Sequence, residues 1–524
     1  MEVEWNVLIV ITGLAALLSL GLYRWIRFAL GIGLLFILCL ATGLHVFAGF
    51  PGPQLVLGLV CPLLLVNVVG YVFVTRDTLP VKPTPFVINI PLQKGKLVLQ
   101  NIRRGISIIG AAGSGKTESV VAPLLDHFVQ NGFSGVIHDY KDFELTEIAY
   151  PLIDTDKVDF YPVGFDPIHY RVNPIAPRYM DSEESVNELS RVLVENLLEQ
   201  KESGATGSGK FFTDAVEGLL GGMIWKLKSD YPDYCTLPHL MALYQYLDME
   251  SLEAFLKGNH TAKAMADAFV NGIKSERQTA GVRSTLSNAL KKISTQRNFY
   301  VLSADEVPLD IKQQKRPVIV SVVNNPKYET AYSPVIATII HTLTKQMAVR
   351  NAKPSFLLME EAPTLRLLNM HRIPATLRSY DIATVYVMQD KVQNDILYGD
   401  KASRAILSNL SYQFFGKVND PETAKYYERF FELVKKPTTS INRSHTINFD
   451  TRVTIGEREV SKIRADVFFR LQQGEFIAFA DGKEKRVQFR RPWLQKGLPE
   501  HPKDIDLEGN FYRIHAEIRA LFGK

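Results

Sequence analysis

Cysteine is scarce in this sequence, with three residues in a chain of 524. Cys39 and Cys61 lie in strongly apolar stretches, and Cys235 has no CxxC pair or histidine cluster near it. A disulfide framework and a zinc site are therefore not expected. A strong charge of either sign is missing too, because the net charge of +5 is a small bias over this length. Charge alone does not identify a nucleic-acid-binding protein.

Charged residues are absent from three long apolar runs near the N-terminus. No Lys, Arg, Asp or Glu occurs in residues 6–23, 28–50 and 54–75. A helix that crosses a bilayer needs roughly 20 apolar residues, since hydrocarbon offers the backbone no other hydrogen-bonding partner. The runs predict a transmembrane anchor over residues 1–76 with three spans, and two spans remain the alternative. A signal peptide fits less well, because Glu2 and Glu4 precede the first run and no small-residue cleavage site follows it.

The basic residues around these runs give the anchor one consistent orientation. Arg24 and Arg27 separate the first two runs, and Arg76 and Lys82 follow the third. Loops rich in Lys and Arg stay in the cytoplasm. The N-terminus is therefore expected to face outward, and everything after Arg76 is expected to lie in the cytoplasm.

Short β-branched segments alternate with helical patterns after the anchor. They read GISIIG, SGVIHD, RPVIVSVV, PSFLLME, IATVYVMQ and SYQFFGKV. Continuous apolar strands between helices indicate a parallel sheet that is covered by helices on both faces. The fold class is therefore predicted to be α/β, of the nucleotide-binding type.

The soluble part divides into four stretches by pattern. Residues 77–180 and 301–435 carry the strands, whereas residues 181–300 show apolar residues at helical spacing alone. The middle stretch predicts an inserted all-helical domain. Residues 436–524 are polar and β-rich, with Asp481-Gly482 placed for a tight hairpin turn and a final helix near residues 512–521, a modest tail.

The motif GAAGSGKT matches the phosphate-binding loop G-x-x-x-x-G-K-[ST] in full, and it follows the apolar strand ISII. Its residues are Gly110, Ala111, Ala112, Gly113, Ser114, Gly115, Lys116 and Thr117. Backbone N–H groups of such a loop and the following helix N-terminus converge on phosphate oxygens. Lys116 is expected to neutralise the β- and γ-phosphates of ATP, and the Thr117 hydroxyl is expected to bind Mg²⁺.

A second glycine-rich stretch, GATGSGKF at residues 204–211, lacks two features of a nucleotide loop. Phe211 stands where a magnesium-binding hydroxyl belongs, and no strand precedes the stretch. It is therefore interpreted as a flexible loop in the helical domain rather than as a second nucleotide site.

The segment FLLMEE places two acidic residues, Glu360 and Glu361, directly after a buried strand. In a Walker B element, one carboxylate holds Mg²⁺ through water and the next polarises the attacking water. Glu360 is assigned the first role and Glu361 the second. Asp is the usual residue at the first position, so Glu360 is a departure that adds one methylene. An ordinary acidic strand terminus is the alternative.

Two further residues are candidates for catalysis. Gln389 ends the strand VYVMQ, where RecA-type ATPases sense the γ-phosphate, although a buried structural glutamine has the same position. Arg378 carries a fixed charge that suits transition-state stabilisation on a neighbouring subunit's nucleotide. A solvated helix-face arginine is an equally good reading of Arg378.

Together with the two nucleotide motifs, four stretches make the chain similar to type IV coupling proteins of the TraG/TraD family. DYKDFEL at 139–145 is similar to the family's D-P-K-G-E-L, without its Pro and Gly and with one residue inserted. NPI at Asn173 resembles its NP-[LI], and LQQGEFIAF resembles its L-x-x-G-E-x-[IV] strand. MQDKVQNDILYG at 388–399 matches Q-s-x-x-Q-L-x-x-x-Y-G in spacing and is the most discriminating of the four.

The resemblance implies a RecA-like P-loop motor with an inserted all-helical domain, assembled as a homo-hexamer on a membrane stem. It implies a multi-pass protein of the bacterial inner membrane, with the motor in the cytoplasm and ATP and Mg²⁺ as cofactors. Such a motor delivers a relaxase–DNA complex or a secreted protein to the components of a type IV secretion channel. Arg378 falls about where the resemblance places an arginine finger. Three spans with tiny external loops depart from the commoner two-span stem.

Three functional hypotheses follow. The first is a translocating ATPase that contacts single- or double-stranded DNA without reading sequence, and residues 274–292 hold five cations and one acid that suit phosphates. A plain solvated helix face is the alternative for that stretch. The second is a nucleotide-switched receptor platform that docks substrates without translocation. The third is an FtsK-type DNA pump, which should carry a winged helix at its C-terminus where this chain is β-rich.

Overall fold

The computed structural model describes residues 2–25, 30–76, 84–198, 208–272, 276–443 and 451–523. The chain forms two compact units, Met1–Thr84 and Pro85–Lys524, and each is described by itself. The linker charge Lys82 and the loop residue Arg27, used above to orient the anchor, lie outside the described residues.

The first unit is a set of apolar helices: α1 (Glu2–Trp25), α2 (Leu30–Ala48), α3 (Gly52–Leu55), the π-helical turn η1 (Val56–Val60) and α4 (Cys61–Arg76). Leu8, Leu59 and Leu63 are buried between them, whereas many other apolar side chains, such as Leu38 at 67% exposed, face outward. In the described part, one helical stretch, Gly52–Gly70, is long and apolar enough to cross a membrane. Two shorter apolar stretches, Trp5–Leu18 and Leu34–Ala48, accompany it.

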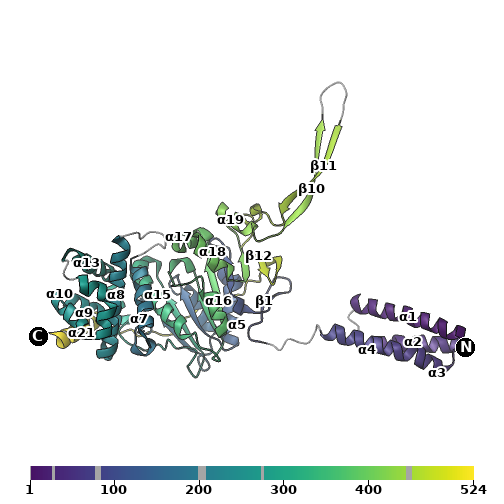
Figure 1. Ribbon diagram of the computed structural model, residues 1–524, viewed down its shortest axis with the longest axis horizontal. Helices are drawn as coiled ribbons and strands as arrows, with labels where there is room; N and C mark the ends of the chain where they lie inside the picture. Colours follow the sequence, from purple (N-terminus) through teal and green to yellow (C-terminus); the bar gives the residue numbers. More distant parts are fainter. Residues whose placement is uncertain are drawn as a thin grey trace. The chain divides into compact units, whose positions relative to one another are not determined.

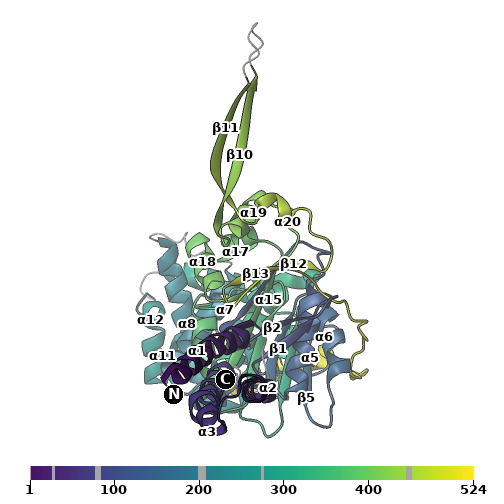
Figure 2. The same ribbon diagram turned by 90° about the vertical axis from the view of Figure 1, so that its right-hand side faces the viewer.

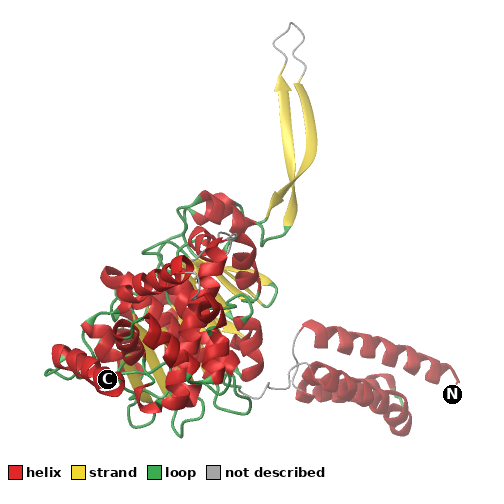
Figure 3. Ribbon diagram, turned by 60° about the vertical axis from the view of Figure 1, so that its left-hand side comes forward, coloured by secondary structure: helices red, strands yellow, loops and turns green. Residues whose placement is uncertain are grey.

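A mixed nine-stranded sheet forms the centre of the second unit (Figures 1 and 3). Its strands are β3 (Ile106–Ile109), β4 (Ser134–Asp139), β5 (Asp159–Val163), β6 (Val318–Val323), β7 (Ser355–Met359), β8 (Ile382–Met388), β9 (Tyr412–Phe415), β12 (Glu475–Ala480) and β13 (Lys483–Gln488). The order is β13-β12-β9-β3-β8-β7-β4-β6-β5. The seven strands from β9 to β5 are parallel, and β12 and β13 extend them as an antiparallel pair. All six strands that the sequence predicts are present.

Both faces of the sheet are covered, which explains why its parallel strands are apolar at every position. Neighbouring residues of one strand, such as Leu357 and Leu358, belong to different hydrophobic clusters on the two faces. On one face lie α5 (Ala122–Gln130), α6 (Glu144–Ala149) and the small sheet of β1 (Ile88–Pro91) and β2 (Lys96–Leu99). On the other lies α15 (Glu329–Gln346). The α/β class is therefore confirmed.

The stretch without strands is a bundle of helices that packs on α15 through α7 (Figure 1). Its members are α7 (Glu183–Leu197), α8 (Ser208–Asp230), α9 (Leu237–Tyr246), α10 (Met249–Lys257), α11 (His260–Met265), α12 (Asp267–Gly272), α13 (Glu276–Ile293) and α14 (Gln296–Val301). The basic stretch 274–292 falls mainly on α13, and residues 274 and 275 lie outside the description.

The interpretation of residues 204–211 as a loop is wrong for their described half. Lys210 and Phe211 lie in the first turn of α8, which runs on for 23 residues, and residues 199–207 lie outside the description. The apolar-periodic sequence that follows Phe211 propagates the helix back to Ser208, because extending an existing helix costs much less than nucleating one. The second glycine-rich stretch therefore leads into a helix of the bundle.

The C-terminal helix α21 (Leu507–Phe522) is longer than predicted and is no mere tail. Ile514 and Ile518 are fully buried. The Glu517 carboxylate lies 2.9 Å from His239 Nε2 on α9, and the Phe511 ring packs 4.7 Å from that of Phe299 on α14. The amphipathic pattern was visible in the sequence, but its partner was not. Residues near the C-terminus therefore return to the helical bundle.

The β-rich residues after 435 split into two hairpins. Asp481 and Gly482, both at positive φ, join β12 to β13 and add them to the main sheet, as the turn signal predicts. The other hairpin, β10 (Leu433–Arg443) and β11 (Thr451–Ser461), forms a separate two-stranded sheet. It projects from the second unit between α19 (Pro421–Glu428) and α20 (Ala465–Phe468), as Figures 1 and 2 show. We call this hairpin, residues 433–461, the arm.

Candidate nucleotide site

Four neighbouring parallel strands, in the order β3-β8-β7-β4, bring polar residues to one edge of the sheet. The phosphate-binding loop follows β3, Gln389 follows β8, Glu360 and Glu361 follow β7, and Asp139 ends β4. Carboxyl ends of parallel strands meet at a common edge, and ligands of open α/β sheets bind there. Motifs that are far apart in the sequence therefore lie at one surface.

The loop Gly110–Thr117 has a backbone that only glycine adopts readily at two positions, since Gly113 and Gly115 have φ of 74° and 86°. A Cβ at Gly115 would lie 3.0 Å from the backbone nitrogen of Gly474. That nitrogen donates a hydrogen bond of 2.8 Å to the Ser114 carbonyl. The stretch LQQGEF therefore belongs to the nucleotide site, although the sequence offered only a family resemblance for it.

Lys116 is buried and turned back onto its own loop. Its Nζ donates hydrogen bonds to the carbonyl oxygens of Gly110, at 2.6 Å, and Ala111, at 3.4 Å. Burial lowers the pKa of Lys116, and the nearby Glu361 carboxylate opposes that shift. An ammonium held by neutral carbonyls gains by moving to phosphate oxygens, since charge-assisted hydrogen bonds are the stronger ones.

Glu360 and Glu361 are both 3% exposed, and the Lys141 ammonium lies beside them. Lys141 Nζ is 3.3 Å from Glu360 Oε1 and 3.7 Å from Glu361 Oε1. Burial and the nearby Asp139 raise the pKa of Glu360 to about 7. Glu360 Oε2 is buried and has no hydrogen-bond partner among the described residues, so it fits a water bound to Mg²⁺.

Gln389 and Glu361 are in direct contact. Gln389 Nε2 donates a hydrogen bond of 3.1 Å to Glu361 Oε1. Glu361 is held in the left-handed region, with φ of 43°, a conformation that costs energy in a residue other than glycine. The two predicted catalytic residues of adjacent strands therefore lie together, with the glutamate fixed by the turn that follows β7.

Arg378 does not join them. It begins the 3-10 turn η9 (Arg378–Tyr380) just before β8, so it lies at the amino end of that strand, the edge opposite the phosphate-binding loop. Its side chain is exposed and makes no hydrogen bond or ion pair among the described residues. The chain itself therefore does not bring Arg378 to its own nucleotide site.

Asp139, Lys141 and Thr146 were missed as site residues. Asp139 Oδ2 accepts hydrogen bonds from the Thr146 backbone nitrogen, at 2.7 Å, and hydroxyl, at 2.6 Å. Burial raises the pKa of Asp139 to about 6. Their signal was the position of DYK directly after the buried strand SGVIHD, since polar residues at such a strand end face the ligand edge.

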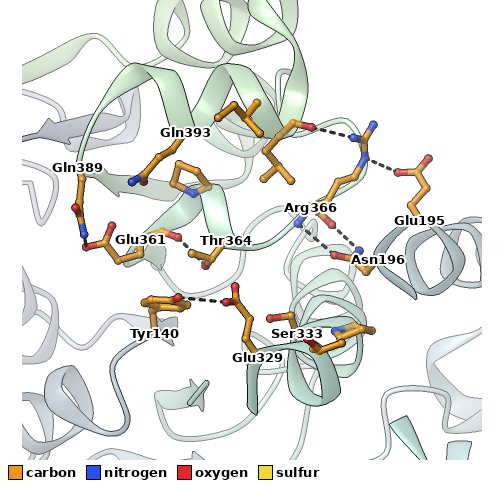
Figure 4. A pocket seen from close by; sticks show the side chains of 15 residues that line it. Tyr140, Glu195, Asn196, Glu329, Ser333, Glu361, Thr364, Arg366, Gln389 and Gln393 are labelled. Atoms are coloured by element: carbon orange, nitrogen blue, oxygen red, sulfur yellow. Dashed lines mark hydrogen bonds and ion pairs between the residues drawn. The ribbon is translucent and has the colours of Figure 1, made fainter. Parts of the chain in front are cut away.

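A cavity of about 610 Å³ opens beside Glu361 (Figure 4). The polar residues in its lining include Tyr140, Glu195, Asn196, Glu329, Thr364, Arg366, Gln389 and Gln393. Tyr140 donates a hydrogen bond of 3.3 Å to Glu329. The cavity thus joins the catalytic edge to α15 and to α7 of the helical bundle.

Arg366 fastens the loop after Glu361 to the helical bundle. Its Nε lies 3.1 Å from Glu195 Oε2 on α7, and its carbonyl accepts a hydrogen bond of 2.9 Å from Asn196 Nδ2 (Figure 4). Its Nη1 donates to the Leu397 carbonyl, at 3.0 Å, on α17 (Lys391–Tyr398). The position of Glu361 therefore depends on α7 and α17 as well as on β7.

Comparison with known families decides the class of the protein. The sequence profile of the type IV secretion-system coupling protein DNA-binding domain matches residues 90–462. The chain belongs to this coupling-protein family. The match begins within β1 and extends to the end of the arm, so it includes every residue of the nucleotide edge described above except Gly474.

Solved structures agree on the fold. An unbound form of the bacterial conjugative coupling protein TrwBΔN70 is 14% identical, with a TM-score of 0.62, and covers 78% of this chain and 90% of its own. TrwB with ADP and Mg²⁺ and TrwB with a non-hydrolysable ATP analogue are each 14% identical, with TM-scores of 0.59, over 76% of this chain and 87% of theirs. No curated protein matches the sequence. The second unit therefore has a RecA-type ATPase fold of the TrwB kind.

Proposed function

We propose that this coupling protein is a membrane-anchored ATPase that recruits a DNA–protein or protein substrate and delivers it to a type IV secretion channel. The observation that carries the proposal is the meeting of Lys116, Glu361 and Gln389 at one sheet edge in a chain of this family. The relatives described with ADP, Mg²⁺ and an ATP analogue support nucleotide binding at such an edge.

The residues of the edge divide the chemistry among them. Backbone N–H groups of the loop that ends at Thr117 bind the phosphates, and Lys116 exchanges its carbonyl contacts for the β- and γ-phosphate oxygens. Glu361 orients and polarises the attacking water, and Gln389 holds the Glu361 carboxylate in place. Thr117 and Glu360 would hold Mg²⁺, which would supply charge neutralisation for the phosphates.

Arg378 has a role only if a second subunit is present. We propose a homo-hexamer in which the exposed Arg378 of one subunit reaches the nucleotide of the next. Its place at the opposite edge of the sheet supports action on a neighbour rather than on its own nucleotide.

The first unit is proposed as a multi-pass anchor in the bacterial inner membrane, with the motor in the cytoplasm. Gly52–Gly70 has the length and hydropathy of a span, and leucines such as Leu17 and Leu57 are 69% and 68% exposed. Apolar side chains on the outside of a helix cluster suit hydrocarbon rather than water. The proposal includes α1 and α2 as the other two spans.

A nucleotide-switched receptor remains a second candidate because Glu360 replaces the usual Asp. Both functions need ATP, but only the motor needs its cleavage. The test is the ATPase rate of the full-length protein, with and without single-stranded DNA, in the native form and in the Lys116→Ala and Glu361→Gln variants. DNA-stimulated hydrolysis that both variants lose supports the motor. Nucleotide binding without hydrolysis, together with substrate transfer by Glu361→Gln, would favour the receptor.

A further inference from the structure

The arm is an isolated two-stranded ribbon. Its strands contain 11 residues each, so at about 3.4 Å per residue it extends roughly 35 Å. Both strands pair only with each other among the described residues. A lone hairpin is marginally stable in water, so a bound partner would stabilise it.

The register of the arm separates its residues into two faces, because cross-strand partners share a face and neighbours along a strand alternate. The first face pairs Val434 with Val460, Lys436 with Arg458 and Thr438 with Gly456. No Asp or Glu occupies any of these six positions. We call these six residues the basic face.

The opposite face carries charges of both signs. It pairs Lys435 with Glu459 and Pro437 with Glu457. Lys435 Nζ also lies 3.5 Å from the diagonal Glu457 Oε2, which makes an ion pair. These residues therefore present no net positive charge to an anion.

Lys436 and Arg458 create an imbalance on the basic face. They are directly opposite each other, both are exposed, and neither forms an ion pair in the described part of the chain. Like charges in directly opposed positions destabilise a strand pair. An anion bound across the two side chains would reverse that cost.

The base of the arm is connected to the phosphate-binding loop. The Ala111 backbone nitrogen of the phosphate-binding loop donates a hydrogen bond of 2.7 Å to the Lys417 carbonyl. From Lys417 the chain passes through α19 to β10, and the rings of Tyr427 and Phe468 at the base of the arm are fully buried, 4.9 Å apart. A packed connection therefore leads from the ATP loop to the base of the arm.

We propose that the basic face of the arm binds the sugar–phosphate backbone of double-stranded DNA, an inference that rests on the proposed function. Lys436 and Arg458 suit phosphates. A two-stranded ribbon fits the major groove of a duplex. The family match, described as a DNA-binding domain, includes the whole arm. A lipid surface is a less suitable partner for the basic face, because its two valines, Val434 and Val460, lie at the base of the arm. Membrane-binding faces are largely apolar.

The test removes both unbalanced cations from the full-length protein in neutral detergent. Fluorescence anisotropy of a labelled duplex of arbitrary sequence, without nucleotide, gives Kd over a range of salt concentrations. Each lost phosphate contact flattens the slope of log K against log salt by about 0.9. We expect Lys436→Gln/Arg458→Gln to raise Kd about tenfold at low salt and to flatten the slope by about 1.8.

The matched control removes two exposed, carboxylate-paired lysines elsewhere, Lys157→Gln/Lys257→Gln, which changes the net charge equally. It should leave both Kd and slope close to the native values. Equal loss in the control and arm variants would overturn the arm as the binding surface, since net charge alone would explain the result.

The remaining outcomes separate the arm from the proposed function. Native protein that hydrolyses ATP and binds the duplex, with an arm variant that binds equally well, overturns the inference and leaves the proposed function intact. Native protein that neither binds DNA nor hydrolyses ATP defeats the proposed function itself. An arm variant with normal DNA binding but a smaller oligomer on size-exclusion chromatography would assign the face to a second copy and overturn the proposal.

Discussion

The nucleotide edge and the arm differ in how their charges are balanced. At the edge, Lys141 lies within 3.7 Å of both Glu360 and Glu361, and Gln389 holds the second carboxylate. On the arm, Lys436 and Arg458 oppose each other, and neither forms an ion pair with a carboxylate in the described residues. Charges that are paired within the fold hold a fixed geometry for catalysis. Unpaired charges on an exposed ribbon are available to bind a charged partner. The following predictions test that difference, from the largest effect to the smallest.

Loss of Lys116 should affect the edge alone. Lys116→Ala removes a charged hydrogen-bond donor, so ATP affinity should fall by about 2 to 3 kcal/mol, or roughly a hundredfold, and hydrolysis should be lost. Equilibrium binding of a fluorescent ATP analogue measures the change. The arm variant Lys436→Gln/Arg458→Gln should bind ATP like the native protein. Equal losses in both would show that the two regions are not separate.

Substitutions of two glycines at similar φ separate the effect of steric crowding from the effect of backbone strain. Gly115 and Gly482 have φ of 86° and 76°, but only a Cβ at Gly115 meets backbone, at Gly474. Gly115→Ala should cost about 2 to 3 kcal/mol of unfolding free energy and weaken nucleotide binding, whereas Gly482→Ala should cost about 1 kcal/mol. Denaturant titration of both variants checks the order. A larger loss for Gly482→Ala would contradict the packing of the loop.

The link from the edge to the helical bundle should have an intermediate effect. Arg366→Ala leaves Glu195 without this partner in a pair whose side chains are 9% and 15% exposed, at a cost of about 1 to 2 kcal/mol. Because Arg366 holds the loop after Glu361, kcat should fall more than the ATP affinity. Arg191→Ala removes the exposed partner of Glu195 and is the control, with an expected cost below about 0.5 kcal/mol. Equal kinetics in the two variants would contradict the proposed link between the helical bundle and Glu361.

The smallest effects are expected from one variant that should gain arm stability and lose DNA affinity. Lys436→Glu places a carboxylate opposite Arg458, which should stabilise the arm by about 0.2 to 1 kcal/mol. The same change should weaken duplex binding. Hydrogen exchange of the arm amides reports the first effect and fluorescence anisotropy the second. A variant that is stabilised yet binds DNA as well as the native chain would show that the charge imbalance serves something else.

The sequence predicted which strand ends carry the candidate nucleotide-site residues because its signals are local. GAAGSGKT follows one apolar strand, and Glu360, Glu361 and Gln389 directly follow two others, so parallel pairing alone brings them together. Asp139 and Lys141 were not assigned a chemical role because their stretch was interpreted only as a family resemblance, although it directly follows a buried strand. The packing of Gly474 on Ser114 could not be foreseen, since it joins segments about 360 residues apart.

The sequence predicted strands after residue 435 and a final helix, but not how the arm and α21 pack, because packing partners are not encoded locally. Alternation in residues 436–461 indicates strands but does not say whether they join the main sheet or leave it. The amphipathic face of α21 requires a surface to pack on, and no local pattern indicates that α9 and α14 provide it. The helical start of α8 at Ser208 shows the converse case, in which the sequence after Phe211 outweighed the glycines before it.

The central claim is that ATP is bound at the loop ending in Lys116 and Thr117, and that Glu361 activates the water that cleaves it. The most direct measurement is a single-turnover assay on the Glu361→Gln variant with γ-labelled ATP and Mg²⁺, in which binding and release of phosphate are followed together. The account predicts tight retention of intact ATP, with cleavage slowed at least about a hundredfold relative to the native protein. Cleavage at the native rate, or failure of both proteins to retain ATP, would contradict it.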